Sequence, residues 1–148
     1  MEIIFKILCG LLYCVGLPFG WSYQTTSIYI CIYLWPILCT LSTLPIVWQS
    51  VKLTRRKPVM GMIFTIISLV YTSCYALFTI DAINRYNISN PNSFTNCMID
   101  LLSLAAYLGI TYETLNILIY VVLFVVIISI NYILSKIISK YNKKLNKL

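Results

Sequence analysis

Three long apolar runs constrain this chain more than any other feature of its sequence. Residues 25–48, 59–80 and 112–134 contain a single charged residue between them, Glu113 near the start of the third run. Each run is long enough, at 1.5 Å per residue, to cross a hydrocarbon core about 30 Å thick. Because lipid offers the backbone no hydrogen-bond partners, such runs must be helical. The sequence therefore predicts an all-α, polytopic bundle of membrane helices.

The composition agrees with a membrane solvent. Hydrophobic residues make up 60% of the 148 residues and charged residues only 10%, whereas soluble domains carry about 25% charged residues. The mean hydropathy is +0.87. This length suits one domain, so we treat residues 1–148 as a single integral membrane domain.

The net charge of +7 comes from basic residues that follow two of the apolar runs. One cluster is Lys52, Arg55, Arg56 and Lys57, and the other, in the tail 135–148, is Lys136, Lys140, Lys143, Lys144 and Lys147. A basic protein can bind nucleic acid, but clusters placed directly after apolar runs are typical of cytoplasmic flanks. We therefore expect no nucleic-acid partner and a cytoplasmic C-terminus, in a plasma or inner membrane.

The segments between the runs suggest further elements. Residues 81–95 are polar, rich in Asn and interrupted by Pro91, which predicts an outer loop. Residues 97–109 are too short to span and predict a helix lying in the membrane interface. Residues 1–20 fit either a second interfacial helix or a fourth span. Pro36, inside the first run, lacks an N–H and predicts a kink.

The sequence GWSYQTTSIYI at 20–30 is nearly repeated as GITYETLNILI at 109–119. The identical pairs in this alignment include Gly20 with Gly109, Tyr23 with Tyr112, Thr25 with Thr114, Ile28 with Ile117 and Leu34 with Leu123. Each copy opens a run that ends in basic residues, so an internal duplication is the favoured explanation. Both copies would then run from outside to inside, and residues 59–80 would return. This predicts three spans with the N-terminus outside, or four if residues 1–20 cross.

Both copies have the residue types of a helix start. The set comprises Gly20, Ser22, Tyr23 and Gln24, and then Gly109, Thr111, Tyr112 and Glu113. The glycine permits a sharp turn, the hydroxyl residue can cap the first amides, and an amide or acid in the first turn suits the helix dipole. The tyrosine is a type that anchors at headgroup level. A ligand-binding motif displayed twice is the alternative, but helix initiation accounts for every residue type.

Small and hydroxyl residues recur along one face of the second run. They are Gly61, Thr65, Ser68, Thr72, Ala76 and Thr79, which we call the stripe. Such a face lets a neighbouring helix approach closely, and it could also line a narrow aqueous path. Packing is the favoured interpretation. The third run carries further polar residues, namely Asn116, Tyr120, Ser129, Asn131 and Ser135. We expect a buried Asn among them to seek a partner on another helix.

The residues that are missing exclude several functions. No Lys, Arg, Asp or Glu lies deep within a run, which argues against proton relays, voltage sensors and transporters of charged substrates. There is no histidine, and the four acids are scattered, so no base–nucleophile pair is apparent and we expect no enzyme. Without histidine or a CxxC pair we also expect no metal and no cofactor.

Two functions remain. The first is a module that self-associates into a pore-forming or bilayer-perturbing assembly. Holins and membrane-acting effectors are likewise small helical membrane proteins, which is an analogy of architecture only. The second is an accessory subunit or anchor of a larger membrane complex that docks a cytoplasmic partner. The expected partners are accordingly the lipid bilayer, and either a further copy of the chain or an unidentified membrane or cytoplasmic protein.

Overall fold

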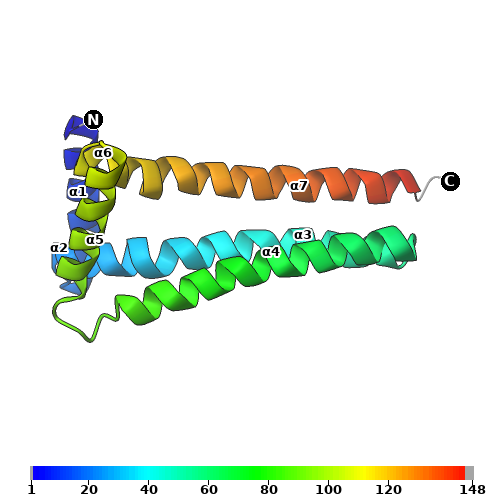
Figure 1. Cartoon of the computed structure of the whole chain (residues 1–148), viewed down its shortest axis with the longest axis horizontal. Coiled ribbons are helices and arrows are strands. Elements are labelled where there is room, and N and C mark those ends of the chain that lie inside the picture. Colours follow the sequence, from blue (N-terminus) through cyan, green and yellow to red (C-terminus); the bar gives the residue numbers. More distant parts are fainter. Residues whose placement is uncertain (1, 146–148) are drawn as a thin grey trace. The chain divides into compact units, whose positions relative to one another are not determined.

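The computed structural model describes residues 2–145, and these residues form helices joined by short turns (Figure 1). In chain order the elements are α1 (Glu2–Gly16), η1 (Leu17–Phe19), α2 (Tyr23–Ser27), η2 (Ile28–Leu34), α3 (Trp35–Thr54), α4 (Pro58–Arg85), α5 (Ser93–Leu108), α6 (Tyr112–Ile117), η3 (Leu118–Leu123) and α7 (Phe124–Leu145). The predicted all-α class is confirmed. Four stretches of the described chain are long and apolar enough to cross a membrane: Glu2–Phe19, Tyr23–Thr54, Pro58–Arg85 and Tyr112–Lys144.

Several helices extend beyond the predicted boundaries. The expected loop at 81–95 is shorter, because α4 continues to Arg85 and α5 begins at Ser93. An ion pair between Arg85 and Asp81, one turn apart and 3.4 Å between charged atoms, supports the last turn of α4. The tail 135–148 is helical as far as Leu145. Lys147 lies outside the described residues.

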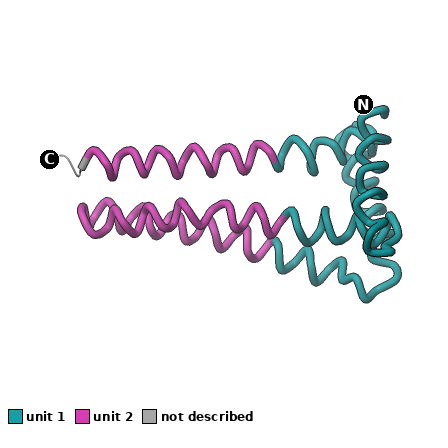
Figure 2. Tube along the Cα trace, turned by 180° about the vertical axis from the view of Figure 1, so that it is seen from behind, with its two compact units in different colours: residues 1–35, 79–124 teal, residues 36–78, 125–148 magenta. Residues whose placement is uncertain are grey.

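The chain divides into two compact units (Figure 2). Unit 1 contains residues 1–35 and 79–124, and unit 2 contains residues 36–78 and 125–148. Unit 1 therefore holds α1, α5 and both copies of the repeated segment. Unit 2 holds most of α3, α4 and α7.

In unit 1, the axes of α1 and α5 cross the axis of α2 and do not run parallel to it (Figure 1). Both α1 and α5 pack against α2 and α6, the two helices that open the repeated segments. Gly16 at the end of α1 approaches α2 so closely that an added Cβ would lie 2.1 Å from Thr26 Oγ1. The absence of a side chain at Gly16 is thus a condition for this crossing.

The two repeated segments have matching local geometry. Gly20 and Gly109 both adopt the left-handed conformation, each with φ of 67°. A short α-helix follows each glycine, and each then passes into a π-helical segment, η2 and η3. π-Helices are rare, so their presence at nearly equivalent positions is a further similarity between the two repeated segments. At the end of η2 the N–H of Trp35 donates to the carbonyl of Ile30, and the backbone has returned to α-helix when it reaches Pro36.

Unit 2 buries many of its polar side chains and exposes many of its apolar ones. Among its most buried side chains are those of Thr43, Ser50 and Asn131, each 0% exposed. Large apolar side chains such as Ile63 and Leu69 lie exposed on the outside. This inverted distribution is expected of helices whose outer faces meet lipid, since hydrogen bonds and close packing, rather than exclusion of water, hold them together.

Candidate functional site

The stripe on α4 packs against α3 of the same chain. Gly61 lies so close to the end of α3 that a Cβ there would stand 2.2 Å from the backbone N of Thr54. The hydroxyls of Thr54 and Thr65 are 3.1 Å apart, and Thr72 donates to Thr43 Oγ1 at 2.9 Å. α3 and α4 therefore approach each other closely at these three positions of the stripe.

The remaining stripe residues are placed differently. Ser68 is buried, and its hydroxyl donates to the carbonyl of Thr65 at 2.9 Å. Ala76 is half-buried, and Thr79 is buried but belongs to unit 1. The hydroxyls of Thr65, Ser68 and Thr72 thus already have partners within the chain.

Asn131 joins the three helices of unit 2. This side chain on α7 donates from Nδ2 to Ser42 Oγ on α3 at 2.6 Å, and its Oδ1 accepts from the hydroxyl of Tyr71 on α4 at 3.0 Å. The Tyr71 hydroxyl also lies 3.3 Å from that of Tyr75. The sequence indicated only that a buried Asn of this run seeks another helix, because neither Ser42 nor Tyr71 stands out among the polar residues of the apolar runs. The other asparagine, Asn116, instead donates from Nδ2 to the carbonyl of Tyr112 in its own helix.

A second polar contact ties the two basic clusters together. Asn142 on α7 is 6% exposed and donates from Nδ2 to the carbonyl of Gln49 at 2.9 Å. The backbone carbonyl of Asn142 accepts a hydrogen bond from the guanidinium of Arg56, in the connector between α3 and α4, at 2.5 Å. The connector cluster and the lysines around Asn142 therefore meet at one end of unit 2, which we call the basic end.

Charge is divided sharply between the units. Unit 1 contains all four acidic residues, and its two basic residues both pair with acids: Lys6 with Glu2 at 2.7 Å and Arg85 with Asp81 at 3.4 Å. Unit 2 contains the other nine basic residues and no acid. The basic end thus has no acid in its own unit to neutralise it.

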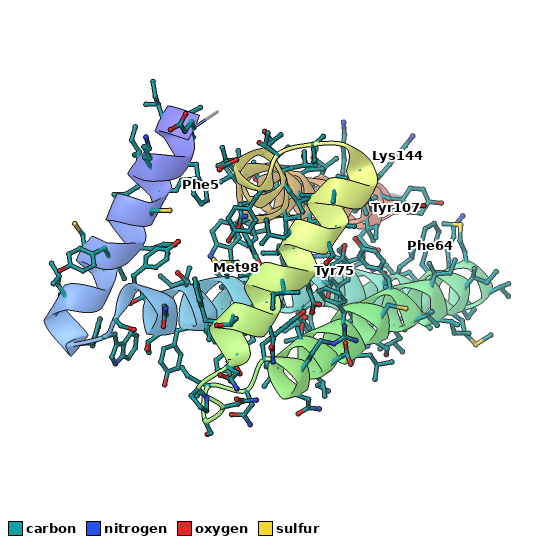
Figure 3. The ribbon with its side chains drawn as sticks, turned by 60° about the vertical axis from the view of Figure 1, so that its left-hand side comes forward. Phe5, Phe64, Tyr75, Met98, Tyr107 and Lys144 are labelled. Atoms are coloured by element: carbon teal, nitrogen blue, oxygen red, sulfur yellow. The ribbon has the colours of Figure 1, made fainter. Side chains whose placement is uncertain are left out.

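A groove opens between α4 and α7 in unit 2. It encloses about 640 Å³, and we call it the α4–α7 groove. Its lining residues are Ile46, Ser50 and Leu53 of α3, Met60, Phe64, Ile67, Ser68 and Tyr71 of α4, and Ile130, Leu134, Ile137, Ile138 and Tyr141 of α7. The lining is mostly apolar, and its polar members are Ser50, Ser68, Tyr71 and Tyr141. Figure 3 shows Phe64 on α4.

The caps of the repeated segments are those that the sequence predicts. Ser22 Oγ accepts from the backbone N–H of Thr25 at 3.2 Å, and Thr111 Oγ1 accepts from that of Thr114 at 3.3 Å. In both copies the two hydroxyls also contact each other. Gln24 is exposed and Glu113 is partly exposed, each in the first turn.

The two tyrosines of the repeated segments pack against α1. The Tyr23 hydroxyl lies 3.3 Å from Cys9 Sγ, and the Tyr112 ring lies edge-on to Phe5 at 5.8 Å between centroids. Both tyrosines are half-buried and line a second cavity, in unit 1. The sequence suggested headgroup anchors, but the crossing of α1 over both helix starts gives these rings a partner within the protein.

The described residues contain no group of three or more His, Cys, Asp or Glu side chains positioned to hold a metal ion. All six cysteines are free thiols, including Cys9, Cys14 and Cys97 near the segment ends. No protein-family model, curated protein sequence or solved structure matched this chain when it was compared with them.

Proposed function

We propose that this protein is a non-enzymatic membrane module that self-associates through the α4–α7 groove and, once assembled, permeates or perturbs the bilayer. The α4–α7 groove is the observation that supports this proposal. A volume of about 640 Å³ lined mainly by apolar side chains is large enough to receive side chains of a further helix. Its occupant, in our proposal, is the exposed apolar face of a helix from a second copy.

The walls of the groove support a helix as occupant. Ile67 and Ile137 are each 59% exposed, and Phe64 is 41% exposed, so these side chains are available for contact. Ser50 and Ser68 also line the groove and are small, which allows close approach between helices. Association of membrane helices relies on van der Waals packing as well as hydrogen bonds, and even an interhelical hydrogen bond contributes only about 0.6–2 kcal/mol. An extended groove therefore suits association better than a single point of contact.

The assembly, and not the single chain, is the proposed active form. The hydroxyl groups of Thr65 and Thr72 in the stripe are bonded to carbonyls or hydroxyls of α3 and α4. A permeation path would therefore form between copies. No charged side chain lies deep in the apolar runs, so such a path would be poorly selective.

The proposed topology has three spans, formed by α2–α3, α4 and α6–α7, with the basic end in the cytoplasm. The charge division supports it, because Lys and Arg accumulate on the cytoplasmic side of membrane proteins. Trp48, 62% exposed with Lys52 Nζ 5.0 Å from its ring centroid, marks an interfacial position at this end.

We assign α1 and α5 to the outer membrane interface. Their course across the beginning of α2 within unit 1 supports this assignment, since an interfacial helix lies along the membrane and not through it (Figure 1). The matched glycines, caps and π-helical segments support an internal duplication in which each copy pairs an interfacial helix with a span. With α1 in the interface, the N-terminus lies outside.

Two tryptophan substitutions on α4 test the proposal. Ile67→Trp fills the groove, whereas Ile66→Trp places the same bulk at an exposed position outside it. In a mild detergent the wild type should form a homogeneous homo-oligomer, and its expression should collapse the membrane potential. Ile67→Trp should shift the chain to smaller species and restore the potential, while Ile66→Trp should behave as wild type. A wild type that stays monomeric at all concentrations, or leaves the potential unchanged at high expression, would contradict the proposal.

The basic end supports a second candidate function, an anchor for an acidic cytoplasmic partner. Its connector and C-terminal lysines form one surface through the contact of Arg56 with Asn142, with no acid in unit 2. Co-purification of another protein in fixed stoichiometry would favour this function. The double change Arg55→Glu and Lys57→Glu should then abolish that co-purification without altering the size of the chain's own assembly.

A further inference from the structure

Unit 1 contains a cavity of about 250 Å³, and the proposed self-association through the α4–α7 groove does not involve it. It is lined by residues of α1, α2, η2, α5, α6 and η3, and by Trp35 at the start of α3. Figure 3 shows two of its lining residues, Phe5 on α1 and Met98 on α5. The cavity is therefore built by the two crossing helices together with the beginnings of both repeated segments.

Several polar groups at the cavity wall already have hydrogen-bond partners within unit 1. Cys9 Sγ contacts the Tyr23 hydroxyl at 3.3 Å, and Ser27 Oγ donates to the Tyr23 carbonyl at 2.8 Å. Asn116 Nδ2 donates to the carbonyl of Tyr112 at 2.9 Å. The rest of the lining is mainly carbon and sulfur, contributed by residues such as Cys31. Because apolar cavities stay dry and accept hydrocarbon, this wall favours an apolar ligand.

The cavity is continuous with the apolar outer surface of the chain. Leu11 and Val15 of α1 both line it, and they are 56% and 49% exposed. On a protein with apolar spans this outer surface meets lipid, so a ligand can enter sideways from the bilayer. The volume lies below the ~300–1,000 Å³ of pockets for drug-sized molecules, which suits a single narrow chain better than a bulky ring system.

We propose that this cavity binds one alkyl chain, either an acyl chain of a membrane phospholipid or that of a free fatty acid, with the polar headgroup left outside. The bound chain fills the space between α1, α5 and the two helix starts. It therefore holds the interfacial helices against the spans and stabilises unit 1. This binding does not depend on self-association through the α4–α7 groove.

The cysteines of the chain provide a test with an internal control. Cys9, Cys31 and Cys97 line the cavity, whereas Cys14 and Cys74 are exposed and do not line it. The full chain is purified in a steroid-based detergent, which has no alkyl chain to compete. Alkylation of each thiol by N-ethylmaleimide is then followed by peptide mass spectrometry, with and without palmitic acid or a dipalmitoyl phospholipid.

Occupancy should protect the cavity thiols selectively. At a ligand concentration ten times its dissociation constant, alkylation of Cys9 and Cys97 should slow about tenfold because only the empty fraction reacts, while Cys14 and Cys74 should react as before. Protection by palmitic acid alone identifies a fatty acid as the ligand, and protection by the phospholipid identifies a membrane lipid. Equal alkylation rates with and without both ligands would overturn the proposal.

A pair of variants on α1 makes the test independent of thiol reactivity. Leu8→Trp fills the cavity, and Ile7→Trp adds the same bulk at a 58% exposed position that does not line it. Native mass spectrometry should detect a bound lipid or fatty acid on the wild type and on Ile7→Trp, and none on Leu8→Trp. If Leu8→Trp keeps native helicity and the same bound mass, the cavity is not the binding site.

Discussion

Asn131 Nδ2 donates to Ser42 Oγ at 2.6 Å and so bonds α7 to α3, across 89 positions of the chain. The Asn131 side chain is 0% exposed and Ser42 is partly buried. The other end of the same amide accepts from Tyr71 on α4. One side chain thus fixes how three helices align along their length, and the interior of unit 2 depends on it.

Replacing Asn131 by Leu should loosen unit 2. The change removes two interhelical hydrogen bonds, each worth about 0.6–2 kcal/mol in a membrane bundle, and leaves the hydroxyls of Ser42 and Tyr71 without this partner. The SDS fraction at half-unfolding, followed by circular dichroism, should fall. Ser129→Leu, at an exposed position of the same helix, should leave it nearly unchanged. Equal midpoints for both variants would show that the bonds contribute nothing.

Gly61→Ala should also destabilise unit 2. A Cβ at this position would stand 2.2 Å from the N and 2.3 Å from the Cα of Thr54, both backbone atoms that cannot turn aside. Overpacking of this kind typically costs about 1–3 kcal/mol, and the same SDS titration measures it. Gly10→Ala is the matched control. A Cβ on Gly10 meets nothing within 4 Å, so that change should be neutral or stabilise α1 by up to about 1 kcal/mol.

Loss of either N-cap should free the amide that it holds. Ser22→Ala and Thr111→Ala remove the acceptors of the Thr25 and Thr114 N–H groups, at a cost of about 0.5–2 kcal/mol. Hydrogen–deuterium exchange should therefore become roughly 2- to 30-fold faster at amide 25 or 114 in the corresponding variant. Asn in place of Ser22 or Thr111 preserves the cap and should keep exchange slow. Accelerated exchange in the Asn variants would show that the cap is not the cause.

Alkaline pH should weaken the contact between α5 and the turn that follows α4. Burial, and then the hydrogen bond from the Tyr86 hydroxyl to Asp100 Oδ2 at 2.5 Å, raise the pKa of Tyr86 to about 12 from its ordinary 10.0. A raised pKa means that the neutral phenol is favoured in the folded chain. Its stabilising contribution is complete below pH 10 and is lost as the pH rises to about 12.

The variant Tyr86→Phe isolates this contribution. Between pH 10 and 12 its stability should fall less steeply than that of the wild type, and the ultraviolet difference spectrum of the two chains should show one phenol ionising near pH 12. Tyr107→Phe, which changes an 87% exposed ring on α5, should leave the wild-type slope. A Tyr86 phenol that ionises near pH 10 would contradict the prediction.

The proposed topology predicts which positions an impermeant reagent can reach. In a chain without its six natural cysteines, Asn92→Cys should react with an impermeant maleimide in intact cells. Lys144→Cys, at the basic end, should react only after the membrane is permeabilised. The expectation follows from the nine basic residues of unit 2. Labelling of Lys144→Cys alone in intact cells would reverse the orientation of the whole chain.

Local features of this protein could be predicted from its sequence because they depend on residues close together in the chain. Apolar runs predict helices, since lipid leaves the backbone no other partner. Ser22 and Thr111 predict caps because the amide that each accepts lies three residues away. The helix ends were predicted less well. Hydropathy indicates only which residues can lie in lipid. α4 continues beyond them through polar residues as far as Arg85, because the helical hydrogen bonds and the ion pair between Arg85 and Asp81 still form one turn back along the chain.

The sequence by itself determined that the chain is all-α and where its apolar runs lie, and it favoured a packing partner for the stripe and for a buried asparagine of the third run. Only the tertiary structure decided that the partner of the stripe is α3 of the same chain, that Asn131 joins Ser42 and Tyr71, and that Arg56 meets Asn142 across 86 positions. The physical reason is that hydrogen bonds between helices depend on which helices become neighbours and on how far each is shifted along its axis relative to the other. Many small and hydroxyl residues in the apolar runs could satisfy the same donors, and only the packed arrangement of backbones selects among them.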